Sequence, residues 1–161
     1  MTSSSRPRSR AAISGPLVLV ADDDEDIRTL ICIRLRQAGY ETIAAADGVQ
    51  ALRLVRERLP ELCILDLVMP KLNGLEVTRA LRKSTALAGM PVIMLTAAAQ
   101  AADRDRCLDA GADEYMTMPF AATELEARVD SLLALSRSSP NRDRATEKNH
   151  GRVPSLIMAP A

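Results

Sequence analysis

The sequence lacks any apolar run near the length of about 18 residues that a membrane-spanning helix needs, so no membrane contact is predicted. Cysteine is scarce, with only Cys32, Cys63 and Cys107, an odd and widely spaced set within apolar or helical stretches. This spacing argues against a disulfide framework and against a cysteine metal cluster. Reduced cysteines in a cytoplasmic protein are the interpretation that fits.

The chain also has no excess of basic residues in its central part, although its overall charge is zero. Residues 16–136 contain 13 Lys and Arg against 19 Asp and Glu, while residues 1–15 and 137–161 each carry an excess of three basic residues. An acidic body argues against a nucleic-acid-binding surface, so no direct DNA binding is expected. We interpret residues 1–15 as a disordered basic leader and residues 137–161 as a disordered basic tail, with weak attraction to nucleic acid as the alternative.

The remaining 16–136 segment has the length and pattern of one α/β domain. Short apolar runs alternate with helical periods, and strands are predicted at 17–21, 41–44, 62–65, 91–95 and 114–117. The central runs are apolar almost throughout, which is typical of parallel strands covered by helices on both faces. No periodic segment follows residue 136, so no output domain is expected.

Four of the helices can be delimited from their apolar spacing. They are predicted at residues 27–38, ending at Gly39, and at 49–58, 101–110 and 121–136. The helix at 101–110 is the weakest of them, because it has mainly alanines and Cys107 to bury. A loosely anchored helix is a candidate moving part.

Acidic residues follow two of the predicted strands. A run of five acids at 22–26 comes directly after the first strand, and Asp66 comes directly after the third. Helix capping alone would explain Asp24 or Asp26, but crowded carboxylates raise one another's pKa unless a cation compensates. If the two strands are neighbours in a parallel sheet, Asp22, Asp23 and Asp66 meet at one edge, in an oxygen site suited to Mg²⁺.

Two other strand ends point to the same edge of the sheet. Thr96 and Ala97 follow the predicted strand at 91–95, and Pro119 lies just beyond the strand at 114–117. An X-Pro bond in a tight turn makes Pro119 a candidate for a cis peptide. Four strand ends are therefore expected to line one pocket.

Four segments together carry a family resemblance. In this order and spacing, LVLVADDDEDIR, LCILDLVMPKLNGLEV, PVIMLTA and GADEYMTMPF closely resemble the receiver domains of bacterial response regulators, the CheY-like superfamily of two-component systems. The resemblance covers residues 16–136. It implies a single doubly wound (βα)5 domain of flavodoxin-like fold, with a five-stranded parallel sheet in the order 2-1-3-4-5.

The resemblance also implies roles for individual residues. Asp66 would accept a phosphoryl group, while Asp22, Asp23, Asp66 and the backbone carbonyl of Val68 would hold Mg²⁺. Thr96 would hydrogen-bond a phosphoryl oxygen. A carboxylate that attacks an activated phosphoryl group needs such a cation to offset the repulsion between two anions.

The family's switch and output surface are implied in the same way. Ala97 would lie beside the bound phosphoryl group, and Tyr115 corresponds to the aromatic that turns inward when the threonine moves. A half-buried strand aromatic is the alternative interpretation of Tyr115. The output face would consist of the helix at 101–110, the strand at 114–117 and the helix at 121–136.

One position departs from the family pattern. Met118 stands where the family normally has a lysine that pairs with the acceptor carboxylate. Phosphoryl uptake is expected to slow, unless Lys71 or Arg104 substitutes, and the alternative is a pseudo-receiver that binds proteins without phosphorylation. Val68 and Ala98 are apolar where related domains often carry groups that orient water, so a long-lived phosphoaspartate is expected.

Two other functional classes fit the sequence less well. A nucleotide or flavin binder of the same fold needs a Gly, Ser or Thr-rich phosphate loop after the first strand, where this chain is acidic. A haloacid-dehalogenase-like phosphatase needs a second acid at position 68, which is Val. We therefore expect no enzyme activity beyond the domain's own phosphoryl uptake and loss. The expected partners are a sensor histidine kinase or phosphotransfer protein, a separate effector, and in addition a weak homodimer.

Overall fold

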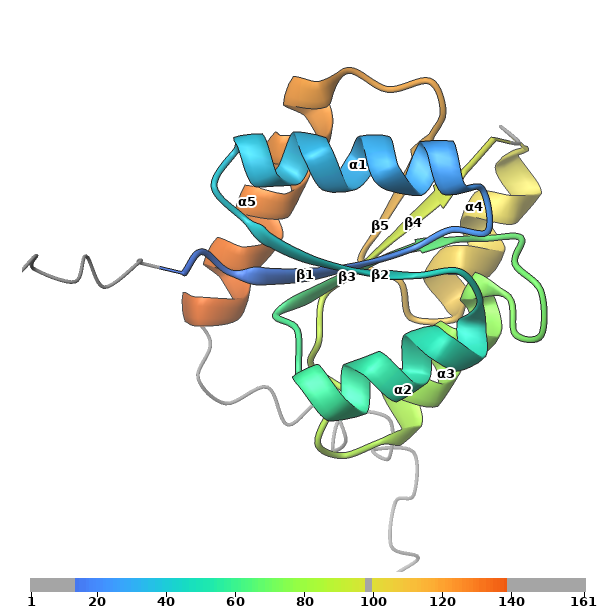
Figure 1. Ribbon diagram of the computed structural model, residues 1–161. Coiled ribbons are helices and arrows are strands. Elements are labelled where there is room, and N and C mark those ends of the chain that lie inside the picture. Colours follow the sequence, from blue (N-terminus) through green and yellow to red (C-terminus); the bar gives the residue numbers. More distant parts are fainter. Residues whose placement is uncertain (1–13, 98–99, 139–161) are drawn as a thin grey trace, which may run out of the picture.

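The computed structural model describes residues 14–97 and 100–138, which alternate strands with helices five times (Figure 1). The strands are β1 (Leu17–Ala21), β2 (Glu41–Ala45), β3 (Leu62–Asp66), β4 (Val92–Thr96) and β5 (Glu114–Thr117). The helices are α1 (Glu25–Gln37), α2 (Gly48–Arg58), α3 (Gly74–Lys83), α4 (Ala101–Asp109) and α5 (Ala122–Ser138). The predicted leader and tail lie almost entirely outside the described residues.

All five strands are parallel and lie in the order β2-β1-β3-β4-β5, which confirms the predicted doubly wound, flavodoxin-like α/β fold. Because every strand runs the same way, all their carboxyl ends lie at one edge of the sheet. The order reverses direction at β1, whose neighbours are β2 and β3. The crevice between the ends of β1 and β3 is therefore the topological switch point, where ligands bind in folds of this kind.

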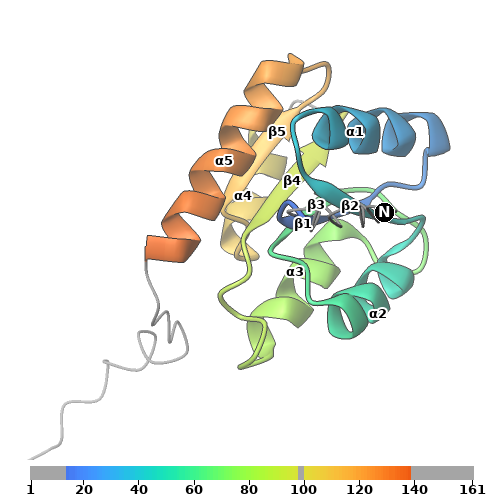
Figure 2. The ribbon, with the colours of Figure 1, turned by 60° about the vertical axis from the view of Figure 1, so that its left-hand side comes forward.

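Helices cover both faces of the sheet and divide the core into two layers (Figure 1, Figure 2). One cluster packs α1 and α5 against one face, and includes Leu35 and Val129. The other packs α2, α3 and α4 against the opposite face, and includes Val55, Leu81 and Cys107. Burial on both faces explains why the central strands are apolar along their length.

The third and fourth strands each extend one residue further than the sequence suggests. Both predicted strands stop at their last leucine, but the ladder continues because Asp66 pairs with Leu95 and Thr96 pairs with Thr117. Asp66 and Thr96 are therefore held as the final residues of strands. A polar residue at the end of a strand remains within the backbone ladder while its side chain reaches the crevice.

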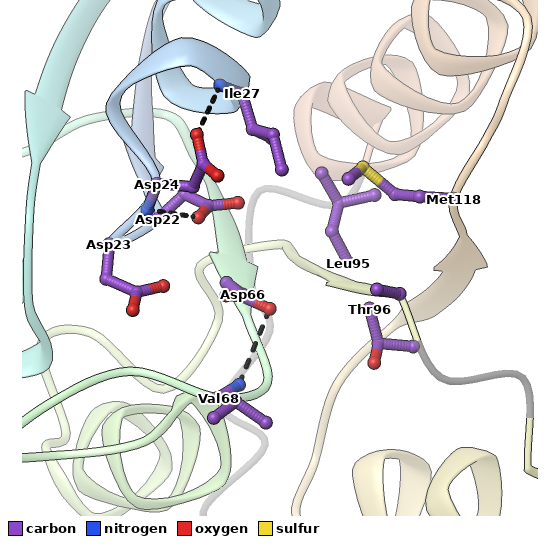
Figure 3. Close-up of a pocket in the computed structure, with 10 residues that line it drawn as sticks. Asp22, Asp23, Asp24, Ile27, Asp66, Val68, Leu95, Thr96 and Met118 are labelled. Carbon is purple, nitrogen blue, oxygen red and sulfur yellow. Dashed lines mark hydrogen bonds between the residues drawn. The ribbon is translucent and has the colours of Figure 1, made fainter.

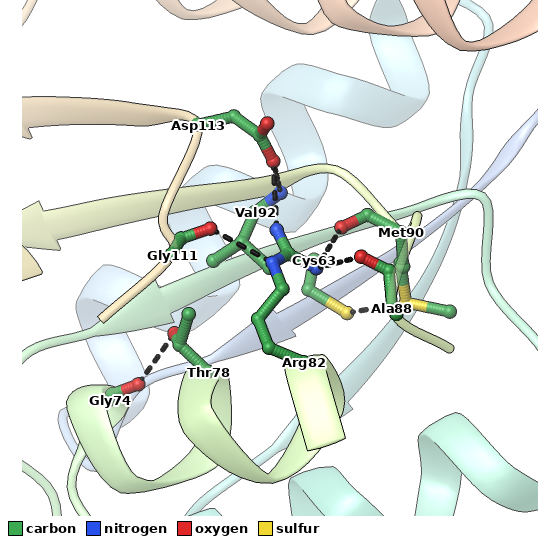
Figure 4. A network of polar contacts seen from close by, with 9 residues as sticks. All are labelled: Cys63, Gly74, Thr78, Arg82, Ala88, Met90, Val92, Gly111 and Asp113. Atoms are coloured by element: carbon green, nitrogen blue, oxygen red, sulfur yellow. Dashed lines mark hydrogen bonds and ion pairs between the residues drawn. The ribbon is translucent and has the colours of Figure 1, made fainter. Parts of the chain in front are cut away.

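A polar network joins α3 to the segments that precede β4 and β5 (Figure 4). Arg82 donates hydrogen bonds to the carbonyl oxygens of Ala88 (3.0 Å), Met90 (2.7 Å) and Gly111 (2.9 Å), and to the carboxylate of Asp113 (2.9 Å). Gly111 has a φ of +105°, and an added Cβ would lie 2.8 Å from the Arg82 side chain. Arg82 thus fixes the connection from α3 to β4 and the connection from α4 to β5.

The described helices and the three cysteines are consistent with the composition. Among the described residues, the helices are either too short or too polar to cross a membrane. Cys32, Cys63 and Cys107 are all buried and all free of disulfide bonds, as their spacing predicted.

Candidate phosphoacceptor site

Three carboxylates converge where β1 and β3 end. Ala21 of β1 pairs with Leu65 of β3, so the residues that follow, Asp22 and Asp66, are neighbours across the two strands. Asp22, Asp23 and Asp66 each offer one carboxylate oxygen, and these three oxygens all lie within 4.8 Å of one another. Figure 3 shows these side chains facing one cavity. The three acidic side chains therefore lie together, as predicted.

Backbone hydrogen bonds hold the loop that carries Asp22. Its backbone N–H donates to the Ala45 carbonyl (3.1 Å), and its carboxylate accepts from the Asp24 N–H (2.9 Å). The Asp24 carboxylate in turn accepts from the N–H groups of Asp26 and Ile27, as an N-cap of α1. Asp24 therefore caps the helix, as the structural alternative proposed, whereas Asp22 and Asp23 belong to the cluster.

Arg28 is a residue that sequence reasoning missed. From the first turns of α1 it donates a hydrogen bond through Nη1 to the Asp22 carbonyl oxygen, at 2.7 Å. The available signal was its place two residues after the acidic run, on the same helix. Arg28 ties α1 to the acidic loop and brings a positive charge close to the cluster.

Crowding and burial raise the pKa of two of the acids. Burial, followed by the repulsion from Asp22, raises the pKa of Asp66 to about 7. Burial also raises the pKa of Asp22, and Asp23 and Asp24 add to the effect, while the hydrogen bond from Asp24 and the charge of Arg28 oppose it. Such a cluster favours a divalent cation, because hard oxygen ligands gathered this closely can be ionised together only if positive charge compensates.

The cavity beside the carboxylates has a volume of about 280 Å³ and is lined from all four predicted strand ends. Thr96 and Met118 lie on the side opposite Asp22 and Asp23 (Figure 3), and Ala97 also lines the cavity. Thr96 is almost fully buried. Among the described residues, the lining of this cavity includes no lysine and no arginine.

The other predicted site residues are placed as follows. The backbone N–H of Val68 donates to the Asp66 carboxylate at 3.4 Å, and the Val68 side chain is exposed. The Met118–Pro119 peptide bond is cis. Tyr115 does not line the cavity; it is partly buried against the core cluster of the α2, α3 and α4 face.

Neither predicted substitute for the family's lysine reaches the cavity. Lys71 forms an ion pair with Asp47, the N-cap of α2, at 3.2 Å. Arg104 lies on the exposed surface of α4 and does not line the cavity. Sequence position alone could not exclude them, since only the fold decides which way a loop or helix residue faces.

Comparison with known proteins places these features in a family. Residues 18–130 match the family model described as "Response regulator receiver domain". The chain is 38% identical over 137 residues to the alkaline phosphatase synthesis transcriptional regulatory protein PhoP of Bacillus subtilis, covering 84% of this chain and 56% of the relative. It is 39% identical over 132 residues to the DNA-binding dual master transcriptional regulator RpaA of Synechocystis, covering 82% and 55%. The chain thus spans about half the length of these curated relatives.

Solved structures show the same relationship. The receiver domain of the Francisella response regulator 1452 superposes with a TM-score of 0.71 at 35% identity, covering 76% of this chain and 99% of that one. The chemotaxis response regulator CheY4 of Vibrio cholerae gives a TM-score of 0.69 at 28% identity, covering 74% and 99%.

Proposed function

Because the chain belongs to the response regulator receiver domain family, we propose that it accepts a phosphoryl group on Asp66 and passes this signal to a partner protein. The observation that carries the proposal is the convergence of three carboxylates within 4.8 Å at the switch point of the sheet. Asp66 ends β3 next to a cavity large enough for a phosphoryl group, and it is the acid with the most strongly raised pKa.

The residues of the cavity suit such a transfer. The Asp66 carboxylate is the nucleophile, and Thr96 lies where its hydroxyl can meet a phosphoryl oxygen. Asp22, Asp23 and Asp66, with the backbone carbonyl of Val68 as the expected fourth ligand, fit Mg²⁺, whose charge would offset the repulsion between nucleophile and substrate. We expect no catalysis of other substrates.

The identity of residue 118 supports a second candidate function. Met118 is part of the cavity wall, and the described lining residues include no lysine or arginine, so within the cavity no side-chain cation faces the acceptor; Arg28 lies outside the lining, on the Asp22 carbonyl. A partly buried charge pair of this kind is worth a few kcal/mol at most, so its loss slows uptake without removing the nucleophile. The alternative is a pseudo-receiver that binds its partner without phosphorylation.

The output surface proposed for the phosphorylated form is the face made by α4, β5 and α5. Tyr115 of β5 lies near Cys107 and Asp103 of α4, and β5 pairs with β4, the strand that ends at Thr96. A movement of Thr96 would therefore be passed to Tyr115 on the adjacent strand. The proposed partners are a sensor histidine kinase or phosphotransfer protein and a separate effector, with weak self-association as an addition. A cytoplasmic location is part of the same proposal.

DNA binding, which is named in the description of RpaA, is not proposed for this chain. Residues 16–136 carry six more acidic than basic residues, which opposes contact with a phosphate backbone. The relatives extend well beyond the part that this chain matches, so their activities as whole proteins do not transfer to it.

The decisive measurement is the intact mass after incubation with an acyl phosphate and Mg²⁺. Wild type, Asp66→Asn and Met118→Lys are compared. We expect a phosphoryl adduct on wild type that is absent in Asp66→Asn and forms faster in Met118→Lys, because an ammonium then neutralises the acceptor and the phosphoryl group.

The same measurement separates the two candidate functions. No adduct on wild type, together with an adduct on Met118→Lys, would establish the pseudo-receiver. If an adduct forms on wild type, its lifetime tests the expectation of a long-lived phosphoaspartate, which was based on Val68 and Ala98. Ala98 lies outside the described residues. Loss of the adduct within seconds at room temperature would contradict a long-lived phosphoaspartate.

A further inference from the structure

A second cavity lies directly beside the acidic one, between α1 and the connection from β5 to α5. It has a volume of about 430 Å³, within the range of small-molecule sites. Among the described residues, those that line it are apolar apart from one arginine: Ile27, Leu30, Ile31, Arg34, Met118, Pro119, Phe120 and Ala122. Leu30 is 55% exposed, although it is a large apolar side chain. We call this cavity the α1 groove.

The α1 groove adjoins the acidic cavity. Ile27 and Met118 line both of them, so these two side chains form the boundary that the two cavities share. In Figure 3, both lie on the side of the acidic cavity nearer α1 and α5, whereas Val68 lies on the other side of Asp66. A lysine at position 118 would place a charge in this wall, whereas Met118 makes it apolar.

We propose that the α1 groove binds the leaving group of the phosphodonor, so that the protein prefers donors whose leaving group is apolar. This inference rests on the proposed function, because it names the class of substrate that Asp66 uses. In phosphoryl transfer the attacking and leaving oxygens lie on opposite sides of phosphorus. The leaving group must therefore extend away from Asp66, and the groove offers it apolar surface directly beside the acidic cavity, past Ile27 and Met118.

The transfer is balanced for an aromatic acyl phosphate such as benzoyl phosphate. An oxygen of the Asp66 carboxylate forms the new bond to phosphorus, and the bond from phosphorus to the acyl oxygen breaks. Benzoate leaves with the electron pair, and no proton has to be supplied because it departs as a carboxylate. The described residues that line the groove include Arg34 and no acidic side chain, so they do not repel the departing anion.

The test compares benzoyl phosphate with acetyl phosphate, using the rate of Asp66 phosphorylation measured by intact mass with Mg²⁺ present. Each rate is divided by the rate at which that donor hydrolyses spontaneously in the same buffer. For wild type, we expect the corrected rate to be about tenfold higher with benzoyl phosphate, as is typical when an apolar pocket holds an added apolar group.

Two matched variants on α1 test whether the groove causes the preference for benzoyl phosphate. Leu30→Gln removes an apolar side chain from the groove and should lower the benzoyl-to-acetyl ratio by about threefold or more. Ile33→Gln makes the same change at a residue that is 44% exposed on the same helix but lines neither cavity, and it should keep the wild-type ratio.

The outcomes separate this inference from the proposed function. Phosphorylation by both donors at equal corrected rates would overturn the inference alone, as would equal ratios in the two variants. No adduct from either donor would overturn the proposed function and this inference with it.

A binding measurement tests the groove without phosphoryl transfer. Phe120 is the only phenylalanine in the chain, so incorporation of 4-fluorophenylalanine gives a single ¹⁹F resonance in the groove. With Mg²⁺ present, phenylphosphonate should shift this resonance and methylphosphonate should not. Equal shifts with both compounds, or no shift with either, would contradict the proposal.

Discussion

Asp66 lies where ionisation is costly, and this cost makes the stability of the metal-free protein depend on pH. Its pKa is raised from 3.8 to about 7, mainly by burial and by Asp22. The folded state therefore holds a proton that the unfolded chain releases near pH 4. Since the folded state binds more protons between about pH 4 and 7, stability falls as pH rises through this range and is level above it.

Asp66→Asn should remove this pH-dependent penalty. We expect the variant to be more stable than wild type at pH 8 by about 1–2 kcal/mol, once solvent screening at a half-buried site is allowed for, with a smaller gain at pH 5. Urea unfolding in EDTA measures both values. Asp105→Asn, which neutralises an exposed acid on α4, is the matched control. A gain that does not grow between pH 5 and 8 would disprove this account of Asp66.

At the scale of elements, the connections around α3 depend on one side chain. Arg82 and Asp113 have side chains that are only 15% and 14% exposed, and Arg82 also serves three carbonyl groups. Removal of the guanidinium leaves a carboxylate and several carbonyls with fewer partners in a partly buried place.

Arg82→Met should therefore lower the free energy of unfolding by about 2–4 kcal/mol. Arg106→Met is the matched control, because Arg106 pairs with Asp103 while its side chain is 64% exposed, and such surface pairs contribute about 0–1 kcal/mol. Chemical denaturation of both variants gives the comparison. Equal effects would mean that the network around Arg82 adds little stability.

The helix α4 is weakly anchored, as its sequence predicted. Within α4, which the structure describes in full, only Cys107 is buried. The residue at the N-cap of α4, Gln100, makes no side-chain hydrogen bond to the helix, whereas α1, α2 and α3 are capped by Asp24, Asp47 and Asn73. A helix with so few buried contacts is suited to a shift between two arrangements.

Gln100→Asp should supply the cap that α4 lacks. Its carboxylate would accept from the N–H groups of the first turn, which stabilises the helix by about 1 kcal/mol. Hydrogen exchange should slow across α4 and remain unchanged in α2. Exchange that stays as fast as in wild type would show that the first turn does not limit the opening of α4.

At the scale of the whole molecule, metal binding should be linked to global stability. If Mg²⁺ binds only the folded state, a concentration of 100 times its Kd stabilises the protein by about 2.7 kcal/mol. The melting temperature of wild type should rise when Mg²⁺ replaces EDTA, and rise more at pH 8 than at pH 6, because Asp66 must be ionised to bind it.

Substitutions within the acidic run test the metal site. Asp23→Asn removes a ligand from the cluster of three and should abolish most of the Mg²⁺-dependent rise. Asp26→Asn removes the same charge from the same run outside the cluster, and should retain the rise. A similar loss in both variants would indicate general attraction of cations to acidic residues.

The sequence by itself determined the five strands and four of the five helices, all but α3, and with the strands the edge of the sheet at which the acids meet. Apolar runs such as those of β1 and β3, alternating with helices, are typical of a parallel sheet covered on both faces, and parallel strands bring Asp22 and Asp66 to one edge. The strand order required the family resemblance, because short apolar runs do not specify their neighbours.

Only the tertiary structure decided which side chains share the cavity. Lys71 and Arg104 were equally eligible by sequence, yet one pairs with Asp47 and the other lies on an exposed helix surface. Arg28 reaches the acidic loop, and Met118 joins the acidic cavity to the α1 groove. Such contacts depend on how helices pack across the sheet, where a residue's direction is set by neighbours distant in sequence.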